Sequence, residues 1–388
     1  MGRIIQRALE TPALGERSMF LWGPRKTGKS FWLRQQFPDA ILIDLLQTEV
    51  FAEYAARPAL LRERQPGWRR RGRSPLILVD EVQKCPALLD EVHWLIENRG
   101  QAFVLTGSSA RKLRTTHANL LGGRAWRREM RPLCFAEVGA VDLESAMVSG
   151  LLPPHFLSPQ PREDLRGYVA DYLRDEIALE AQRRDIPAFA DFLRVAALTA
   201  GELLSYTNVA SECGVSAKVV RGYFDLLEDT LLGFRVAPWT RSRTRRMILT
   251  EKFYLFDIGV VNHLARREPK AGTREFGKSL EQLLLQELTA YRSYRRQDLE
   301  ITFWRTSTGL EVDFILDDKA LAVELKAGTR VGPGDWRSLT ALAEDGPVRR
   351  RVLVSFEREP REVRDARGKI EVLPWRTFLE QLWGGGLL

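Results

Sequence analysis

Short apolar runs alternate with helical patterns over the first third of the chain, from Ser18 to about Ala140. The runs MFLWG, AILIDL, LILVDE and AFVLTG have the apolar character of strands that are buried on both faces. Their alternation with helices predicts an open parallel α/β sheet. The arginine-rich stretch RERQPGWRRRGRSP, between the second and third runs, is predicted to be a surface loop.

The pattern changes in the remainder of the chain. At 388 residues, the chain is longer than one hydrophobic core usually serves. The proline-rich stretch SGLLPPHFLSPQP predicts a linker. Helical periodicity then extends to about residue 232, β-prone segments flank the basic tip RSRTRR, and the last 116 or so residues read as helix, strand, strand, helix. We therefore expect three domains, at residues 1–150, 160–268 and 272–388.

A phosphate-binding loop follows the first predicted strand. GPRKTGKS fits the pattern G-x-x-x-x-G-K-[ST], and it lies between the strand MFLW and the helical segment SFWLRQQF. Glycines let backbone N–H groups curl around phosphates, and the helix N-terminus adds its dipole. Lys29 would reach the β- and γ-phosphates, and the Ser30 hydroxyl would ligate magnesium. The predicted ATP-binding residues are Gly23, Pro24, Arg25, Lys26, Thr27, Gly28, Lys29 and Ser30.

An acidic pair ends the third predicted strand, LILVDE. Asp80 emerges at the carboxyl end of this strand, where ligands of open α/β sheets bind. We expect Asp80 to hold magnesium, directly or through water, and Glu81 to polarise the attacking water. Such a pair can also be a solvated turn, but the preceding phosphate-binding loop favours the catalytic interpretation.

Two further residues are candidates for the ATPase site. Ser108 follows the strand AFVLTG and is predicted to sense the γ-phosphate or the attacking water. Ser108 and Ser109 also suit a helix N-cap before ARKL, and this alternative stays open. Arg124, in LLGGRAW, is predicted to be an arginine finger that acts on a neighbouring subunit. The nearby alternatives for this role are Arg127, Arg128 and Arg131.

Several motifs together resemble one family. GPRKTGKS, LILVDEVQ, LTGSSARKL and LLGGRAWRREMRPLCFAEV are similar to the prokaryotic AAA+ ATPases with a C-terminal domain of unknown function. The resemblance continues through YLRDEI, LLEDTLLGF, KFYLFDIGVVNHL and EVDFIL…VELKAG, and so covers most of the chain. It implies an ATPase core, a winged-helix region and a nuclease-like C-terminal domain.

The middle of the chain contains a helix-turn-helix pattern. ELLSYTNVASECGVSAKVVRGYFDLLED reads as two helices joined at Cys213-Gly214, with Ser216 as the cap of the second helix. The following basic tip resembles a wing that touches a phosphate backbone. Winged helices also dock proteins, and the acidic residues late in the second helix weaken a major-groove interpretation. The predicted DNA-binding residues are Lys218, Arg221, Arg241, Arg243, Arg245 and Arg246.

Two alternating segments near the C-terminus carry a charged face. EVDFIL is expected to place Glu311 and Asp313 on one face of a strand, and its other face carries Val312, Phe314 and Leu316. In AVELK the same alternation places Glu324 and Lys326 together. A short turn, DDK, makes the two strands an antiparallel hairpin, so Asp313, Glu324 and Lys326 are expected to converge.

This arrangement resembles the D…ExK core of the PD-(D/E)xK nucleases. Asp313 and Glu324 would hold magnesium, and Lys326 would assist the cleavage of a phosphodiester. The proline usually written before the aspartate is absent. Glu281 is the first candidate for a further helical ligand, and Glu287 is the second. A hairpin whose outer face is charged only for solubility would show the same alternation, and such folds are also kept for binding alone.

The overall composition adds limits on function. Cys85, Cys134 and Cys213 are isolated and the four histidines never pair, which argues against disulfides and a zinc site. A net charge of +8 suits a polyanion such as DNA, although an arginine-rich composition can also reflect the genome. No apolar run is long enough to cross a membrane, and the N-terminus lacks a signal-peptide pattern, so we expect a cytoplasmic protein.

We therefore expect an α/β protein that combines a P-loop AAA+ parallel sheet, a helical and winged-helix domain and a nuclease-like α/β domain. Its predicted function is ATP hydrolysis with Mg²⁺, coupled to the remodelling of DNA or to movement along it, in a ring-shaped homo-oligomer such as a hexamer. The alternative is an ATP-gated regulatory scaffold whose winged helix docks proteins and whose nuclease-like domain is inactive.

Overall fold

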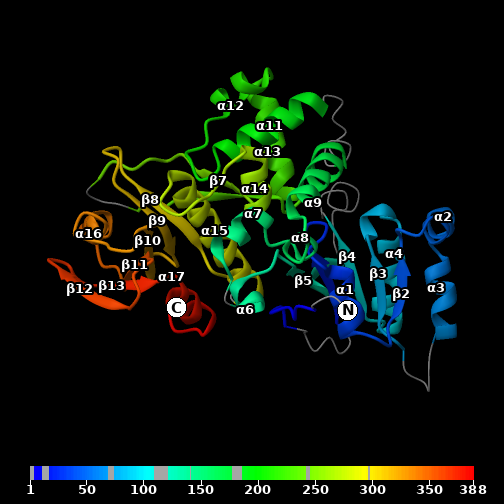
Figure 1. Cartoon of the computed structure of the whole chain (residues 1–388). Coiled ribbons are helices and arrows are strands. Elements are labelled where there is room, and N and C mark those ends of the chain that lie inside the picture. Colours follow the sequence, from blue (N-terminus) through cyan, green and yellow to red (C-terminus); the bar gives the residue numbers. More distant parts are fainter. Residues whose placement is uncertain are drawn as a thin grey trace. The chain divides into compact units, whose positions relative to one another are not determined.

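A computed structural model describes residues 4–10, 17–68, 74–108, 121–139, 141–176, 186–241, 245–295 and 298–388 (Figure 1). The chain divides into two compact units. The N-terminal unit contains Arg7–Arg131 and Asp229–Leu231. The C-terminal unit contains Met1–Gln6, Pro132–Glu228 and Leu232–Leu388. Helix α15 and the strands after it share the C-terminal unit with the preceding helices, so the division into a second and a third domain stays a prediction.

A five-stranded parallel sheet forms the centre of the N-terminal unit, in the order β2-β3-β4-β1-β5. Every apolar run predicted to be a strand forms one, and the sheet is consistent with a P-loop AAA+ fold. The fifth strand was not predicted, because AWRRE is only half-buried at the sheet edge. The strands are β1 (Ser18–Trp22), β2 (Ile41–Asp44), β3 (Ile77–Asp80), β4 (Phe103–Gly107) and β5 (Ala125–Glu129).

Helices pack against this sheet. The core joins Phe20 and Val79 of the strands to Leu88 and Val92 of α4. The first part of the predicted arginine-rich loop is helical instead, because it buries Gln65, whose side-chain amide donates to Gln101 Oε1 at 2.8 Å. The helices and 3-10 turns are α1 (Lys29–Gln36), α2 (Thr48–Ala56), α3 (Leu60–Arg64), η1 (Gln65–Trp68), η2 (Val82–Lys84), α4 (Leu88–Arg99) and η3 (Leu121–Gly123).

The C-terminal unit begins with helices. The proline-rich stretch predicted to be a linker forms α8 and the start of α9, because Pro153 and Pro161 occupy first-turn positions, where a missing N–H costs nothing. The helices are α6 (Phe135–Val138), α7 (Leu143–Ser149), α8 (Pro153–Phe156), α9 (Pro161–Gly167), η4 (Tyr168–Glu176, a π-helix), α11 (Ile186–Leu198), α12 (Tyr206–Cys213), α13 (Ala217–Asp229) and α14 (Ile258–Ala265).

The helix-turn-helix segment has the predicted turn. Gly214 ends α12 in the left-handed conformation, with φ at 65°. Val220, Phe224 and Leu227 of α13 are buried, as their spacing predicts. An antiparallel β6–β7 pair follows, but the connection between these strands packs on the C-terminal sheet through Trp239 and is not a free-standing hairpin.

Eight strands form one mixed sheet in the C-terminal unit, in the order β12-β13-β11-β10-β9-β8-β6-β7. Strands β6 and β7 come from the predicted second domain, and β6 continues the sheet by pairing with β8. The strands are β6 (Gly233–Pro238), β7 (Lys252–Leu255), β8 (Ile301–Arg305), β9 (Glu311–Leu316), β10 (Leu321–Leu325), β11 (Arg350–Ser355), β12 (Arg361–Asp365) and β13 (Gly368–Pro374).

Helices cover both faces of this sheet (Figure 1). The long helix α15 (Arg274–Tyr294) and α17 (Trp375–Trp383) pack on one face, with Leu284 and Phe378 in the core. The short helix α16 (Arg337–Glu344) packs on the other face through Leu339 and Leu342. Among the residues that the structure describes, no helix is both long and apolar enough to cross a membrane.

Candidate nucleotide site and carboxylate cluster

The phosphate-binding loop connects β1 to α1 in the N-terminal unit. Lys26 and Gly28 have positive φ values of 65° and 91°, so the loop curls before α1 begins at Lys29. At Gly23 a side chain would collide with the sheet, because a Cβ there would lie 2.4 Å from the carbonyl oxygen of Met130. The loop is therefore held tightly between β1 and the residue after β5, in the shape that lets backbone N–H groups surround phosphates.

Lys29 is buried within this loop, with 6% of its surface exposed. Its ammonium group donates to the carbonyl oxygens of Gly23 at 2.6 Å and Pro24 at 3.1 Å. Burial lowers the pKa of Lys29, while the nearby Glu81 and Asp80 oppose that effect. Neutral carbonyls are weaker partners for an ammonium than phosphate oxygens are, so this lysine is suited to a polyphosphate.

Asp80 and Ser30 are in direct contact. The Ser30 hydroxyl donates to Asp80 Oδ2 at 2.6 Å, and the Thr106 hydroxyl donates to Asp80 Oδ1. A serine hydroxyl beside a carboxylate provides oxygen ligands of the kind that Mg²⁺ prefers. The two residues therefore fit the predicted magnesium site. Thr106 was not predicted, although a polar residue within the apolar strand AFVLTG was a signal for it.

Glu81, at the end of β3, is connected through Gln83 to Ser108 at the end of β4. It has a φ of 59°, in the left-handed region that is uncommon for a residue with a side chain. The Gln83 amide donates to Glu81 Oε2 and also to Ser108 Oγ, the latter at 3.0 Å. All three side chains are buried. No motif in the sequence points to Gln83, which lies two positions after Glu81.

Ser108 thus lies near the predicted catalytic glutamate. The alternative N-cap role concerns the segment after it, and residues 109–120, including Ser109, lie outside the described part of the chain. Arg124 is exposed, and its guanidinium pairs with Glu97 of α4. The roles of Ser108 as a sensor and of Arg124 as a finger stay predictions.

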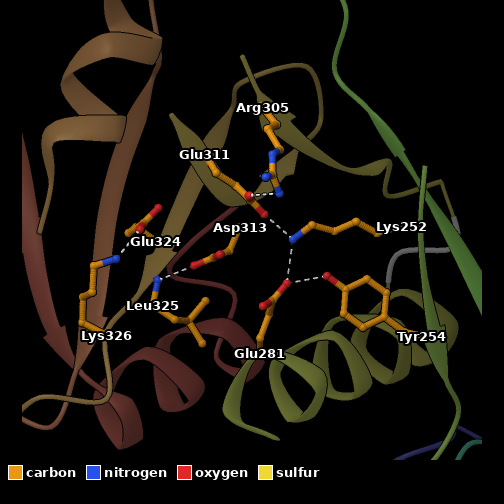
Figure 2. A network of polar contacts seen from close by, with 9 residues as sticks. All are labelled: Lys252, Tyr254, Glu281, Arg305, Glu311, Asp313, Glu324, Leu325 and Lys326. Carbon is orange, nitrogen blue, oxygen red and sulfur yellow. Dashed lines mark hydrogen bonds and ion pairs between the residues drawn. The ribbon is translucent and has the colours of Figure 1, made fainter. Parts of the chain in front are cut away.

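A second group of polar residues lies inside the C-terminal unit (Figure 2). Carboxylate oxygens of Glu281, Glu311 and Asp313 lie within 4.8 Å of one another. Glu281 comes from α15, and the other two come from β9. Lys252, from β7, points into this group: its Nζ lies 2.8 Å from Glu281 Oε1 and 2.5 Å from Glu311 Oε1. Only 1% of the Lys252 surface is exposed.

Neighbouring donors complete this network. Arg305 Nη1 lies 2.8 Å from Glu311 Oε2, and the Tyr254 hydroxyl donates to Glu281 Oε1 at 2.5 Å. Burial alone would lower the pKa of Lys252, but Glu281 and Glu311 outweigh it, and the pKa of Lys252 is raised. The lysine is therefore fully charged at neutral pH.

A β-bulge directs the side chains of β9. The ladder between β8 and β9 shifts by one residue between Thr302 and Trp304. As a result Val312 packs on the face covered by α16, whereas Phe314 packs on the face covered by α15. The predicted alternation, which places Val312, Phe314 and Leu316 on one face, is therefore wrong. Bulges commonly re-aim a side chain in this way.

The predicted D…ExK residues are partly brought together. Asp313 Oδ2 accepts from the backbone N–H of Leu325 at 2.8 Å, while the Glu324 carboxylate pairs with Lys326 at 2.6 Å (Figure 2). Burial raises the pKa of Glu324 to about 7, although Lys326 opposes this. Burial and the nearby Glu324 raise the pKa of Asp313 well above its usual range. Asp313 and Glu324 thus both lie next to Leu325 of β10, but Glu324 is not among the clustered carboxylates.

Of the two helical glutamates, Glu281 belongs to the cluster and Glu287 does not. The Glu287 carboxylate accepts from the N–H of Phe135 at 2.8 Å and from Trp383 Nε1 at 3.0 Å. It lines a separate cavity of about 690 Å³. Burial raises the pKa of Glu287 to about 8.

The predicted DNA-binding residues have different surroundings. Lys218 and Arg221 are exposed on α13, and the Arg221 guanidinium lies 4.8 Å from the centre of the Tyr206 ring. Arg241 pairs with Asp318 at 2.5 Å, and Arg245 pairs with Glu344. Arg246 is exposed and has no side-chain ion pair with another described residue, whereas Arg243 lies outside the described part of the chain.

Comparisons with known families divide the chain into three segments. Residues 15–139 match a family described as "AAA domain". Residues 140–271 and 276–378 match two families described as domains of unknown function, DUF8612 and DUF4143. With the loop geometry, the first match supports a nucleotide-binding ATPase of the AAA type for the N-terminal unit. The second and third matches carry no activity, and the nuclease-like fold stays a prediction.

Two relatives and two solved structures give further likenesses. Uncharacterized proteins of Mycobacterium bovis (Mb2031c) and Mycobacterium tuberculosis (Rv2008c) are each 26% identical over 313 residues, which is 77% of this chain and 67% of theirs. A structure of Aeropyrum pernix ORC1 in complex with DNA is 14% identical over 66% of this chain and 87% of that chain, with a TM-score of 0.27. The Aeropyrum pernix ORC2 structure, described as ADPNP-ADP complexes, is 12% identical over 65% and 88%, with a TM-score of 0.25. At these scores, neither structure bears on function.

Proposed function

We propose that this protein hydrolyses ATP with Mg²⁺ and couples the turnover to DNA bound by its C-terminal unit. The observation that carries the ATPase part is the contact of Ser30 with Asp80 at 2.6 Å, directly beside the buried Lys29. This arrangement brings a phosphate-binding lysine and two magnesium-type ligands to the carboxyl ends of β1 and β3, which are parallel strands of one sheet.

Each residue of the site has a separate task in this proposal. Lys29 and the loop N–H groups bind the β- and γ-phosphates. Ser30 and Asp80 would hold a magnesium ion, which would supply positive charge beside the phosphates. Glu81 accepts a proton from the attacking water. Gln83 holds the Glu81 carboxylate and connects it to Ser108, as the bridge between the two strand ends supports.

Arg124 is assigned the role of an arginine finger, which acts at the ATP site of a neighbouring subunit in a ring-shaped homo-oligomer. Its exposure supports this role, because a residue that acts across an interface must be reachable from outside its own fold. The surface pair with Glu97 would have to open in the assembly, and an exposed ion pair costs only about 0 to 1 kcal/mol to break.

DNA binding is assigned to exposed basic residues of the C-terminal unit. Lys218 and Arg221 are three positions apart on α13 and therefore share one face of that helix. Arg246 adds an exposed guanidinium on the connection between β6 and β7. Together with the net charge of +8, these residues favour contacts to phosphates rather than to base edges.

A regulatory scaffold that docks proteins is the second candidate. It is favoured by one observation: Arg241 and Arg245, which were predicted to touch DNA, are already paired with acidic residues of the same unit. In this function ATP would gate a protein interface, and DNA would leave the rate of hydrolysis unchanged.

The ATPase assignment is tested by two variants that separate binding from turnover. Lys29→Ala should abolish ATP hydrolysis and weaken nucleotide binding, because it removes the phosphate partner. Glu81→Gln should bind ATP as tightly as the wild-type protein but turn it over slowly, because only water activation is lost. Phosphate release and the affinity for a fluorescent ATP analogue report the two properties. Wild-type turnover in both variants would remove the ATPase assignment.

A further inference from the structure

The resemblance to metal-dependent nucleases implies a magnesium ion among the carboxylates of the C-terminal unit. We propose instead that the Lys252 ammonium is the resident cation of the cluster formed by Glu281, Glu311 and Asp313, and that the wild-type chain holds no divalent metal there. The carboxylate cluster then connects β7 to α15 and β9 through ion pairs without a metal, and it is not a cleavage site. This inference is independent of ATP hydrolysis by the N-terminal unit.

The contacts of Lys252 argue for this assignment. Its Nζ lies within 2.8 Å of oxygens from both Glu281 and Glu311, and these two residues come from a helix and a strand that a metal would have to bridge. A metal bound to the same two carboxylates would occupy the space of the ammonium group. Because Lys252 is 1% exposed, it cannot simply turn out to solvent to make room.

Protein donors also engage two further oxygens of the cluster, Glu311 Oε2 and Asp313 Oδ2. Arg305 donates to Glu311 Oε2 at 2.8 Å, and the N–H of Leu325 donates to Asp313 Oδ2 at 2.8 Å. The Tyr254 hydroxyl donates to Glu281 Oε1, the oxygen that Lys252 also contacts. Divalent magnesium prefers oxygen ligands and keeps several waters, whereas this network consists of N–H and O–H donors around the acids.

The charge balance points the same way. Three carboxylates face two buried or half-buried cations, Lys252 and Arg305, so at most one negative charge is left uncompensated. Glu324, the remaining acid of the predicted D…ExK set, has its own cation in Lys326 at 2.6 Å. A divalent ion would therefore meet a nearly neutral cluster, in which two protein cations would repel it.

The position of Lys252 in the chain indicates a structural function for these ion pairs. Lys252 lies in β7, within the segment 140–271, whereas the clustered carboxylates lie within the segment 276–378. The ion pairs thus connect the strand that follows the helix-turn-helix to the core of the sheet. Because Lys252 is buried among three half-buried acids, the network fixes the register of β7 relative to α15 and β9 without an ion from solution.

Manganese binding, measured by electron paramagnetic resonance, tests the proposal. All proteins carry Ser30→Ala and Asp80→Asn, which silence the nucleotide site, and are stripped with EDTA first. In this background, Asp313→Asn and Glu281→Gln should leave the number of bound Mn²⁺ ions unchanged, because the cluster holds none. Lys252→Met should gain one Mn²⁺ site per chain, and adding Asp313→Asn to that variant should remove it.

Lys326→Met is the matched control, because it removes a lysine from the neighbouring ion pair but leaves Lys252 in place. It should gain no Mn²⁺ site in the cluster. Loss of a bound Mn²⁺ on Asp313→Asn in the presence of Lys252 would overturn the proposal. So would a folded Lys252→Met variant that gains no site. If Lys252→Met does not fold, the comparison of Asp313→Asn with its parent alone decides between the two outcomes.

Discussion

Gln83 offers a sharp test of how the ATPase site is organised. Its amide connects Glu81 to Ser108, and its surroundings leave little room for another arrangement. A Cβ at Gly107 would lie 2.2 Å from Gln83 Oε1, so β4 passes directly against this side chain. Replacing Gln83 by leucine keeps most of the volume but removes the donor to the Glu81 carboxylate.

The size of the effect follows from the bond that is lost. A hydrogen bond to a charged group contributes about 1.5 to 3 kcal/mol. If Glu81 is positioned by this bond in the transition state, kcat should fall by about 10- to 150-fold, since each 1.36 kcal/mol is tenfold in rate. KM for ATP should change by less than about threefold, because Gln83 does not belong to the phosphate-binding loop.

Steady-state ATP hydrolysis with a coupled assay measures both constants. Gly107→Ala is a second, independent perturbation, since the added methyl group must displace the Gln83 amide, and it should lower kcat in the same direction. Thr106→Val serves as a contrast, because it removes a donor to Asp80. It should weaken magnesium binding and so raise the Mg²⁺ concentration that gives half-maximal activity. An unchanged or increased kcat in Gln83→Leu would refute the positioning role, because an increase would mean that the amide restrains Glu81.

Three further predictions concern other parts of the chain. Glu287→Gln should flatten the pH dependence of unfolding of the C-terminal unit. Because the pKa of Glu287 is raised to about 8, the free energy of unfolding of the wild-type protein should fall by roughly 4 kcal/mol as the pH rises from about 4.5 to 8. Melting curves recorded across this pH range should show a shallower slope in the variant, and equal slopes in the two proteins would contradict this. Lys218→Ala and Arg246→Ala should each lower the log–log salt slope of DNA binding by about one unit. Arg241→Ala should change this slope less, because Asp318 already pairs with that arginine. The same change of slope in all three variants would count against the assignment. Arg124→Ala should lower kcat by about 10³-fold, and mixing it with inactive Lys29→Ala subunits should restore activity in assembled rings; no recovery would exclude action across an interface.

The nucleotide site was predictable because its chemistry is local in sequence. Gly23 to Ser30 form one continuous segment, and Asp80 and Glu81 mark the end of one apolar strand. The parallel sheet then brings the ends of β1, β3 and β4 to one edge, so the spacing of strands was enough to place the site. Gln83 and Thr106 escaped notice because their roles depend on side-chain contacts between strand ends, which no motif records.

The carboxylate cluster and the surroundings of the basic tip could not be predicted in full, for three physical reasons. The bulge in β9 breaks the alternation on which the facing of Asp313 was judged. The pairing of β6 with β8 joins segments that composition assigns to separate domains, and that pairing brings Lys252 to the acids. The basic tip reads as a free wing in sequence, yet Arg241 and Arg245 find acidic partners on the same unit. The last two are contacts between residues far apart in the sequence.

ATP hydrolysis measured with and without DNA is the most direct test of the coupling that we propose. The assay compares single-stranded, duplex and branched DNA at one salt concentration, with Lys29→Ala as the blank for contaminating activity. The proposed function predicts that at least one form of DNA raises kcat severalfold in the wild-type protein, and that Lys218→Ala combined with Arg246→Ala reduces this stimulation while leaving the basal rate unchanged. A basal rate that no form of DNA alters, at concentrations that saturate binding, would contradict the coupling and favour the protein-docking scaffold.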